Sequence, residues 1–577
     1  MMKFTGWGDP LKAYDLTHRP SLWPFVRSQL GLEDRLDTTV VNPADLAVPA
    51  PRLDPGFLAS VTAALGASQV STDAQVRLLH TYGKSYRDLL RARAGKLDRV
   101  PDAVLFPTSR AHVEAILAAA TAHRVQVVPF GGGTNIVGGV EADPTRPGMA
   151  ATVSLRQMNR VLAIDPIART ARIEAGALGP ELEAALNAQG FSLGHFPDSF
   201  EFSTLGGWLA TRSAGMQSDA YGKIEDMVVS LTLCTPTGTL VTRNVPRSAT
   251  GPDLAQIAVG SEGTLGIITE AVMQIHPVGL RENRGLLVPG FANGIALARA
   301  LAHRGALPST TRISNPQETA LSFATKSPST GASALFAKAF KSYLRHVRRF
   351  PFDDACLMIT GFEAATASEL SAQRRATLAI CREFGAVELG ANVGAKWFAG
   401  RYDYPYLRDT VMDRGGMADV TETAATWDVL PALYEDVKSS VHAHLRRDQF
   451  PGYVGCHLSH SYPEGACLYF TFAAAREKGR ELPQYLETKR LIFEILLKHG
   501  ATITHHHAVG YELLPWMPRH LGPTGVHILR GLKQTVDPLN LCNPGKLIPG
   551  DTPDLGAYWP PHLICPPRAK TASGPLS

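Results

Sequence analysis

The sequence predicts an α+β fold built from two or three folding units. Three observations predict it: a length of 577 residues, short apolar runs that alternate with helical spacing, and a glycine loop directly after a predicted strand. One hydrophobic core rarely organises so long a chain. The 45% of hydrophobic residues supply enough apolar surface for several cores, which excludes wholesale disorder.

The clearest alternation begins after residue 100. Residues 104–106 have the pattern of a short strand, 111–124 carry apolar residues at helical spacing, and 125–130 form a second strand. A turn at 107–109 supplies a candidate helix cap. The second predicted strand runs straight into the sequence GGGTN at 131–135. These elements are the first of a β-rich region. Its further β-rich segments are expected at 151–155, 161–164, 170–174, 226–243 and 264–276, and a helix is expected at 180–189.

The rest of the chain divides into segments that differ in composition and in the pattern of apolar residues. Residues 1–100 are predicted to be an N-terminal helical region. From 281 to 500 helices alternate with strands, as in an α/β domain with an antiparallel sheet and flanking helices. Residues 501–549 form a returning C-terminal segment, and the proline-rich 550–577 are predicted to be a disordered tail.

The net charge and the cysteine pattern argue against some classes of function and cellular location. The net charge of +5 is small for this length, and acidic and basic residues are interspersed, so a nucleic-acid partner is not expected. The seven cysteines form no CxxC pair, which favours free thiols in a reducing compartment. The first residues lack the apolar run of a signal peptide, and no uncharged apolar run reaches the ~18 residues of a membrane span. We therefore expect a cytoplasmic protein.

The glycine loop at 131–133 is a candidate phosphate cradle. Without Cβ atoms, glycine amides approach an anion closely and adopt unusual backbone angles. The spacing is neither GxGxxG nor that of a P-loop, so those two nucleotide sites are excluded. Taken alone, such a run is more often a plain tight turn.

Two further loops strengthen the cofactor interpretation. Residues 197–216 and 260–266 are dense in glycine and hydroxyl side chains. Small residues suit close packing on a flat cofactor, and hydroxyls suit hydrogen bonds to its polar edge. Three such loops within one β-rich region are poorly explained as coincident turns.

These loops resemble the FAD-binding (PCMH-type) domain of the vanillyl-alcohol oxidase/p-cresol methylhydroxylase superfamily. The resemblance implies a two-part FAD-binding domain, expected over 101–280, and a substrate or cap domain over 281–500. The loop 129–135 contains no histidine, so FAD is expected to be non-covalent. The implied FAD-binding residues are Pro129, Gly131, Gly132, Gly133, Thr134, Asn135, Pro197, Asp198, Ser199, Thr204, Gly207, Thr211, Ser213, Ala214, Glu262, Gly263, Thr264 and Ile267.

Within this superfamily the chain is similar to the alkyldihydroxyacetonephosphate synthase branch over most of 1–548. The similarity rests on KFTGWG at 3–8, GHFPDS at 194–199, YGKIED at 221–226, GACLYF at 465–470 and THHHAVG at 504–510. It implies exchange of the acyl chain of acyl-dihydroxyacetone phosphate for a fatty alcohol, with flavin and without net redox. The alternative is an FAD-dependent oxidase or dehydrogenase of a 2-hydroxyacid or related alcohol. A third interpretation is a flavin- or lipid-binding protein that has lost catalysis. The joint presence of Tyr469, Arg312, His195 and the histidine run at 505–507 argues against it.

The resemblance also assigns roles to single residues. Tyr469 matches the general acid/base, although a tyrosine in a strand is otherwise a core residue. Arg312 matches the arginine at the fatty carboxylate, a task suited to a bidentate guanidinium. Arg408 is a phosphate candidate, and Tyr469, Arg312 and Arg408 form the expected substrate-binding set. His195 is expected in the catalytic set near the flavin.

The run His505, His506 and His507 completes that set. On an extended strand His505 and His507 would share one face and His506 would point to the other. Phosphate and intermediate binding is the implied role. A metal site with His457 and His460 is an alternative, and so is a plain packed cluster. We predict no metal.

Residues 335–350 form a basic amphipathic pattern. Such a helix can lie on anionic lipid, and peripheral membrane contact would help to fetch a lipid substrate. Packing on its own domain explains the pattern equally well. A homodimer is also expected.

Overall fold

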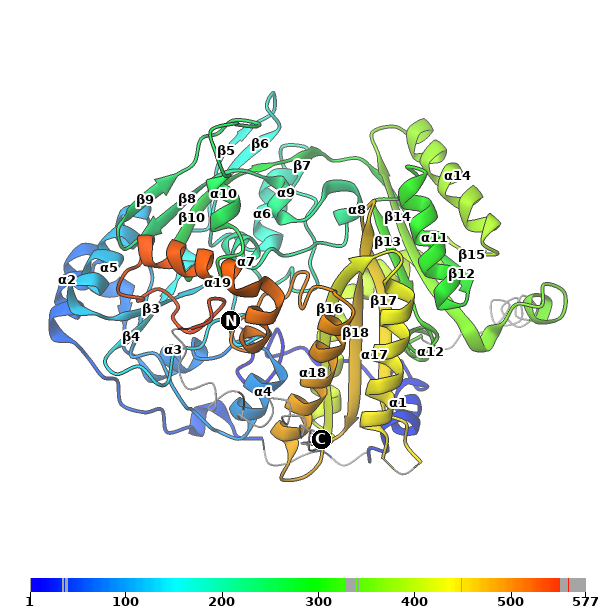
Figure 1. Cartoon of the computed structure of the whole chain (residues 1–577), viewed down its shortest axis with the longest axis horizontal. Helices are drawn as coiled ribbons and strands as arrows, with labels where there is room; N and C mark the ends of the chain where they lie inside the picture. The colour runs from blue at the N-terminus through cyan, green and yellow to red at the C-terminus, as the bar shows by residue number, and fades with distance from the viewer. Residues whose placement is uncertain are drawn as a thin grey trace, which may run out of the picture.

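The computed structural model describes residues 2–33, 36, 40–326, 339, 342–447, 449–550 and 559. Two β-rich halves lie side by side in Figure 1, the first mostly blue to green and the second green to orange. The first half, here called the FAD-type half, contains two larger sheets and one two-stranded sheet, and the C-terminal half contains one large sheet. The expected α+β fold is confirmed.

The first sheet has the order β1-β2-β4-β3 and is built from β1 (Val70–Ser71), β2 (Ala103–Leu105), β3 (Gln126–Phe130) and β4 (Ala150–Ser154). Helix α5 (Arg110–His123) precedes β3, as predicted. The Ser109 side chain caps it by accepting a hydrogen bond from the His112 N–H. Strand β3 then runs into the glycine loop.

The second sheet is antiparallel with the order β5-β6-β10-β8-β9. Its strands are β5 (Val161–Asp165), β6 (Thr170–Glu174), β8 (Val228–Thr235), β9 (Gly238–Val241) and β10 (Ile267–Gln274). Helix α6 (Gly179–Asn187) precedes β7 (Phe191–Ser192), which pairs with β11 (His276–Pro277). Short helices connect these strands: α7 (Leu205–Thr211), α8 (Ser218–Tyr221), α9 (Ile224–Met227) and α10 (Leu254–Ala258).

The C-terminal half contains a seven-stranded antiparallel sheet with the order β15-β12-β14-β13-β17-β18-β16. Its strands are β12 (Leu280–Pro289), β13 (Thr310–Ser314), β14 (Ala355–Ala364), β15 (Val387–Gly390), β16 (Gly416–Thr426), β17 (Tyr453–Ser461) and β18 (Gly465–Ala475). The helices whose buried residues share its core are α11 (Phe291–His303), α14 (Ala367–Glu383), α17 (Leu430–Leu445) and α18 (Glu481–Lys498). Figure 1 shows α17 and α18 side by side against this sheet.

Strand β18 shows how the two faces of this sheet differ. Leu468, Phe470 and Phe472 are buried in the core that the helices share. Tyr469 and Thr471, which alternate with them, line a cavity on the opposite face. A period of two along a strand produces this division. The sheet therefore presents functional side chains and core side chains from one strand.

The N-terminal region carries the helices predicted for it, and its elements pack against both halves. It contains α1 (Leu22–Leu30), α2 (Pro55–Leu65), α3 (Ala74–Leu79) and α4 (Tyr86–Arg93). Helix α1 packs near α12 (Pro316–Ala324) and β18, whereas β1 joins the first sheet. Further helices are α15 (Ala391–Gly400), α16 (Tyr404–Met412) and α19 (Met517–Val536). The N-terminal residues thus contribute to both halves.

The C-terminal segment returns to the FAD-type half, where it completes the first sheet. The Val127 N–H donates to Leu541 O at 2.9 Å, and the Asn543 N–H donates to Val127 O at 2.8 Å. The Asn543 side-chain amide donates to Gly139 O and Glu262 O. This segment therefore ties the glycine loop to the loop around Glu262.

Several predictions fall partly on residues outside the described ranges. Of the predicted tail only Gly550 and Trp559 are described, and Trp559 is fully buried and donates to Glu512 O at 2.9 Å. Of the amphipathic stretch at 335–350 the structure describes 339 and 342–350. There Leu344 is buried in a small cluster with Leu357, whereas Val347 is 66% exposed.

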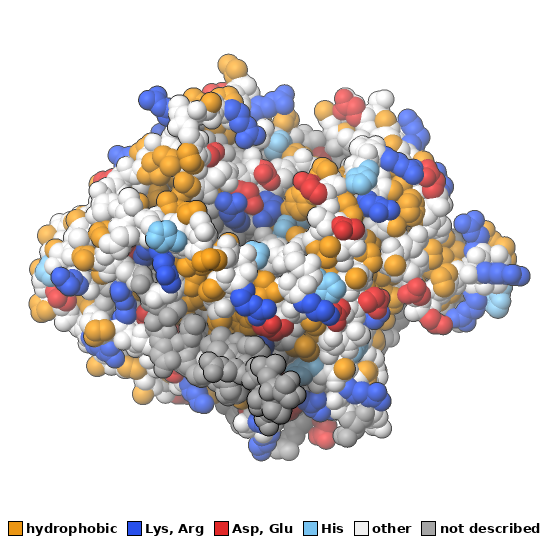
Figure 2. Space-filling model, viewed as in Figure 1, with side chains coloured by type: hydrophobic (Ala, Val, Ile, Leu, Met, Phe, Trp, Pro, Cys, Tyr) orange, Lys and Arg blue, Asp and Glu red, His pale blue; other side chains and the backbone are white. Residues whose placement is uncertain are grey.

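The surface and the cysteines agree with the composition. On the face shown in Figure 2, basic and acidic side chains are interspersed. The six described cysteines are buried and free. Among the described residues, no helix is both long and apolar enough to cross a membrane.

Candidate functional site

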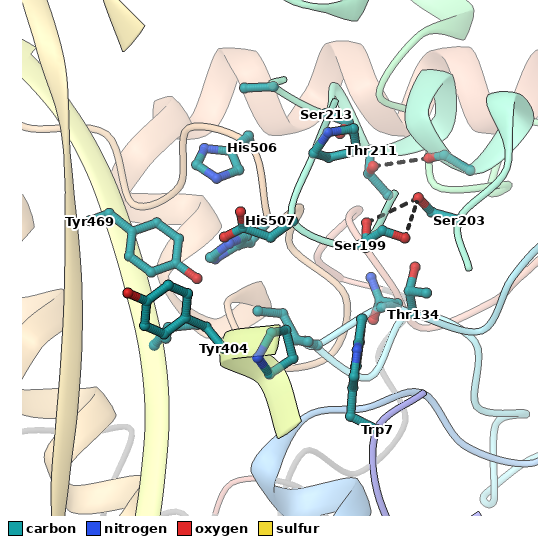
Figure 3. A pocket seen from close by; sticks show the side chains of 18 of the residues that line it. Trp7, Thr134, Ser199, Ser203, Thr211, Ser213, Tyr404, Tyr469, His506 and His507 are labelled. Atoms are coloured by element: carbon teal, nitrogen blue, oxygen red, sulfur yellow. Dashed lines mark hydrogen bonds between the residues drawn. The ribbon is translucent and has the colours of Figure 1, made fainter. Parts of the chain in front are cut away.

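A cavity of about 440 Å³ lies between the FAD-type half and the face of β18 that carries Tyr469. The glycine loop, the hydroxyl-rich loops and the loop around Glu262 form one side. Strands β13, β16, β17 and β18 form the other side, and Trp7 and α1 also contribute. In Figure 3, Tyr469, His506 and Tyr404 lie across the cavity from Ser199, Thr211 and Thr134.

The glycine loop can be built only from glycine at its centre. A Cβ on Gly132 would lie 1.7 Å from Phe202 O, and Gly133 has a φ of +69°. A Cβ on Gly131 would lie 2.3 Å from the hydroxyl of Thr204. The loop backbone is therefore packed against the hydroxyl-rich segment, and its glycines border the cavity where a phosphate could approach closely.

The hydroxyl-rich segment is held by its own side chains. Thr204 accepts from the Gly207 N–H and caps α7, while Thr211 donates to Gly207 O at 2.9 Å. Ser203 joins Ser199 to the Trp208 indole through hydrogen bonds. These contacts, some of them drawn in Figure 3, present hydroxyl groups to the cavity in a fixed arrangement.

Glu262 connects the third loop to the segment after the histidine run. Its two carboxylate oxygens accept from the backbone N–H groups of Val509 and Gly510, each at 2.8 Å. Burial raises the pKa of Glu262 to about 7, although both hydrogen bonds favour the ionised form. Glu262 therefore fixes the histidine segment to the FAD side of the cavity.

The polar atoms on this side fit a polar cofactor. The hydroxyl of Ser261, which lines the cavity, is buried without a partner among the described residues. Such groups are costly unless a ligand or water satisfies them. The glycine loop has no room for a Cβ, and the Ser261 hydroxyl lacks a partner among the described residues. Both features fit a large ligand with phosphate groups and polar ring edges, such as FAD.

Tyr469 lies at the centre of the opposite side. Its ring stacks on His457 with centroids 4.7 Å apart, and His507 approaches it edge-on at 5.3 Å. Burial, together with the negative charge of Asp198, raises the pKa of Tyr469 well above its ordinary value. The phenol is therefore neutral near pH 7 and can donate a proton.

Arg312 pairs with Glu318, which also contacts His457, in a largely buried cluster. Its Nη2 donates to Glu318 Oε1 at 2.8 Å, and His457 Nδ1 lies 3.1 Å from Glu318 Oε2. Burial alone would raise the pKa of Glu318, but His457 and Arg312 hold it at about 2. The Arg312 Nε is buried without a partner among the described residues, which leaves this donor for a ligand.

Arg408 offers a second set of donors. It lies on α16, and its Nη1 donates to Lys84 O at 2.8 Å. Its Nε and Nη2 are buried without partners in the described part of the chain, and the side chain is only 13% exposed. Asp419 lies 3.9 Å away, so the charge is not isolated. Arg408 therefore suits an anionic ligand.

The histidine run is not an extended strand, and the prediction of alternating faces is wrong. Glu422 on β16 accepts from the backbone N–H groups of His505, His506 and His507 at 2.5, 3.1 and 2.9 Å. These three bonds bend the run around one carboxylate. His506 and His507 line the cavity, whereas His505 lies 2.7 Å from the Tyr462 hydroxyl.

Known proteins match this chain in both halves. The family described as "FAD binding domain" matches residues 101–244, and "FAD linked oxidases, C-terminal domain" matches residues 281–547. An alkyldihydroxyacetonephosphate synthase of Dictyostelium discoideum is 41% identical over 573 residues, covering 95% of this chain and 93% of the relative.

The chain belongs to the alkyldihydroxyacetonephosphate synthase family. A solved structure of an alkyldihydroxyacetonephosphate synthase superposes with a TM-score of 0.82 at 37% identity, covering 95% of this chain and 99% of that one. A p-cresol methylhydroxylase structure shares the fold alone, with a TM-score of 0.65 at 14% identity, covering 86% and 98% of the two chains. The expected family, fold and FAD-binding domain are thereby confirmed.

Most residues that the synthase resemblance implied are brought to this one cavity. The predicted FAD-side residues that line it are Pro129, Gly131, Gly132, Gly133, Thr134, Asn135, Pro197, Asp198, Ser199, Thr204, Gly207, Thr211, Ser213, Ala214, Glu262, Gly263 and Ile267. From the other side come Arg312, Arg408, Tyr469, His506 and His507. Their individual roles in a synthase reaction stay predictions.

Three predicted residues are not among the described cavity-lining residues. His195 is fully buried behind Ser213, whose hydroxyl lies 3.2 Å from His195 Nε2. Burial and Lys223 lower the pKa of His195 to about 3, so it is neutral. Thr264 braces its loop by donating to Ser261 O. His195, Thr264 and His505 thus lie outside the described lining of the cavity, and their roles stay predictions.

The alternative of a metal site with His457 and His460 finds no support. His457 is paired with Glu318, and His460 Nδ1 lies 2.5 Å from the Ser218 hydroxyl. Ligand atoms of Glu422, Cys467, His505 and His506 do lie within 4.8 Å of one another. However, both Glu422 oxygens already accept backbone N–H groups, and burial keeps the pKa of the Cys467 thiol well above its ordinary value.

Sequence reasoning missed several residues of the cavity. Trp7 and Phe25 reach it from the N-terminal region, and Tyr404 and Asp419 from α16 and β16. Trp7 could have been found from the sequence, because it lies in the KFTGWG motif shared with the synthase branch. No sequence pattern indicated Phe25, because it lies on a helix whose place in the cavity depends on packing against a distant sheet.

Proposed function

We propose that this protein exchanges the acyl chain of acyl-dihydroxyacetone phosphate for a fatty alcohol, giving alkyl-dihydroxyacetone phosphate for ether lipid synthesis. The reaction releases one fatty acid for each alcohol consumed and has no net oxidation or reduction. The observation that carries the proposal is one cavity bordered both by the glycine and hydroxyl loops and by Tyr469, Arg312 and Arg408. Membership of the synthase family supports it.

Bound FAD would supply an electron-poor ring system next to the reacting carbon. We infer that Gly131, Gly132 and Gly133 hold its phosphates and that Ser199, Thr211 and Ser213 contact its polar parts. The loop has no histidine, which supports non-covalent binding. The backbone of the loop is held close to Phe202 O, so the cradle is preformed.

The opposite side of the cavity supplies the proton and charge chemistry. We infer that Tyr469, a neutral phenol, moves the proton at the substrate carbon. Arg312 holds the departing carboxylate through its unpartnered Nε, and Glu318 keeps the guanidinium oriented. Arg408 binds the phosphate through Nε and Nη2. His507, edge-on to Tyr469, helps to orient its ring.

The test is anaerobic incubation of the purified yellow protein with acyl-dihydroxyacetone phosphate and a long-chain alcohol. No electron acceptor is added, and the products are identified by mass spectrometry. Alkyl-dihydroxyacetone phosphate and free fatty acid in equal amounts are expected. No exchange product, but bleaching of the flavin by a 2-hydroxyacid, would contradict the proposal and favour an oxidoreductase of the same fold.

Membrane contact and a homodimer belong to the same proposal. A long-chain substrate is held in a lipid surface, which supports peripheral binding. The dimer rests on the resemblance alone. Co-sedimentation with anionic vesicles and light scattering of the purified protein measure the two properties separately.

A further inference from the structure

A chain of hydrogen-bonding side chains leads from the cavity towards the edge of the protein. His506 lines the cavity, and its Nδ1 lies 2.9 Å from Nδ1 of His505. His505 Nε2 in turn lies 2.7 Å from the Tyr462 hydroxyl. Both distances are those of real hydrogen bonds. The three groups are therefore linked without a gap, and His506 itself borders the cavity.

Both imidazoles are suited to carry a proton without remaining charged. Burial lowers the pKa of His505 and of His506 well below the ordinary value. Lys223, whose Nζ donates to His505 O at 2.7 Å, adds to this effect, and so do His460 and His507. A neutral imidazole has one donor and one acceptor nitrogen, so it can take a proton on one nitrogen and release one from the other.

The outer end of this chain lies among carboxylates. Tyr462 precedes the exposed Pro463. Burial, the neighbouring Cys467 and the carboxylates of Glu225, Asp219 and Asp226 together raise the pKa of Tyr462. Asp226 is exposed and Glu225 is half-buried. Lys223, whose Nζ donates to His505 O, also lies 2.9 Å from Glu225 Oε1, so a carboxylate that can accept a proton lies beside this end of the chain.

The proposed exchange requires such an exit, and the inference rests on that function. A neutral alcohol enters and a fatty acid leaves, which is ionised at neutral pH because its pKa is close to that of an ordinary carboxyl group. Each turnover therefore releases one net proton inside a largely buried cavity. The described structure offers the proton a bonded route.

We propose that His506, His505 and Tyr462 form a relay that carries this proton from the cavity to the edge at Glu225 and Asp226. His506 accepts the proton on Nε2 and passes the hydrogen on Nδ1 to Nδ1 of His505. His505 releases its Nε2 hydrogen to the hydroxyl oxygen of Tyr462, which releases its own hydrogen to a carboxylate or water. One proton enters, one leaves and no electron moves. Reorientation of the rings and the hydroxyl restores the starting tautomers.

The first experiment compares Tyr462→Phe and His505→Gln with the wild-type holoenzyme. The matched control is Tyr82→Phe, since Tyr82 is also a buried tyrosine whose hydroxyl has a hydrogen-bond partner, here Lys96 O. We expect kcat to fall about tenfold in both relay variants, less than the ~10²–10⁴-fold cost of losing a direct acid or base. KM and FAD content stay unchanged, and the solvent deuterium isotope effect on kcat rises.

Chemical rescue separates a relay from a structural role. Added imidazole is expected to restore turnover of His505→Ala, whereas 1-methylimidazole, which has no N–H to pass on, does not. Equal kcat and equal isotope effects in Tyr462→Phe, His505→Gln and Tyr82→Phe would overturn the relay. So would equal rescue by the two imidazoles.

Nitrogen NMR of histidine-labelled holoenzyme tests the relay without turnover. If the groups are coupled, Tyr462→Phe changes the tautomer populations of both His505 and His506, while Tyr82→Phe changes neither. An unchanged His506 spectrum would overturn the relay whatever reaction the enzyme catalyses. Absence of alkyl product from the wild type would instead overturn the proposed function and leave the NMR result to judge the relay.

Discussion

The rings of His457 and Tyr469 stack with their centroids 4.7 Å apart and their planes 20° apart. The two residues face each other across neighbouring strands, β17 and β18, where they are paired in register. His457 is also bound to Glu318, which holds Arg312. The residue proposed as proton donor and the residue proposed to bind the carboxylate are thus connected through the imidazole of His457.

Tyr469→Phe should abolish most turnover and leave the fold intact. The ring and its stacking on His457 are kept, and only the hydroxyl is lost. We expect kcat for alkyl transfer to fall by ~10²–10⁴-fold. Steady-state kinetics and the flavin absorbance of the purified variant measure the two effects. Tyr82→Phe is the control, and an unchanged kcat would contradict the assignment of the proton to Tyr469.

Gly132→Ala should prevent FAD binding. The added Cβ would lie 1.7 Å from Phe202 O, a backbone atom that cannot move without shifting the loop. The purified variant is expected to lose its yellow colour, because each ~1.4 kcal/mol that the loop displacement costs weakens FAD binding about tenfold. Gly531→Ala on α19, where a Cβ meets nothing within 4 Å, should stay yellow. Full flavin content in Gly132→Ala would refute the cradle.

Arg408→Ala should weaken substrate binding more than it slows chemistry. Loss of hydrogen bonds to a charged group costs roughly 1.5–3 kcal/mol, so KM for acyl-dihydroxyacetone phosphate should rise about 10- to 100-fold. Arg304→Ala, on a half-exposed side chain paired with Glu383, should leave KM unchanged. A fall in kcat at constant KM would place Arg408 elsewhere in the reaction.

Because of Glu318, the free energy of unfolding should decrease in acid. Its pKa is about 2 in the folded protein, below the value of 4.5 for a free glutamate, so the unfolded chain takes up the proton first. The stabilisation is complete above about pH 5 and is lost as the pH falls from about 4.5 towards 2. Urea unfolding between pH 7 and about pH 2.5 measures this loss as the slope of the free energy of unfolding against pH.

The matched variants are Glu318→Gln and Glu435→Gln. Glu318→Gln should unfold more easily at pH 7 and lose less stability on acidification than the wild type. Glu435 is exposed and pairs only with Lys438 among the described residues, so its variant should follow the wild-type slope. Identical slopes for wild type and Glu318→Gln would contradict the buried charge network.

The strands of the FAD-type half could be predicted from local patterns, because apolar runs and their caps lie within a few residues of each other. The alternation along β18 likewise follows from residues that are neighbours in sequence. The conformation of His505, His506 and His507 could not be predicted, because the carboxylate that bends the run is Glu422, 83 residues from His505. The same holds for Phe25, whose place in the cavity depends on α1 packing against distant elements.

The hydrogen bonds of Leu541 and Asn543 have a consequence for the biogenesis of the enzyme. Strand β3 and the loop around Glu262 receive their last backbone and side-chain partners from this late segment. During synthesis the N-terminal half leaves the ribosome long before those partners exist. We therefore expect coenzyme capture to be a closing step of maturation, and chains truncated before residue 541 to accumulate as colourless intermediates.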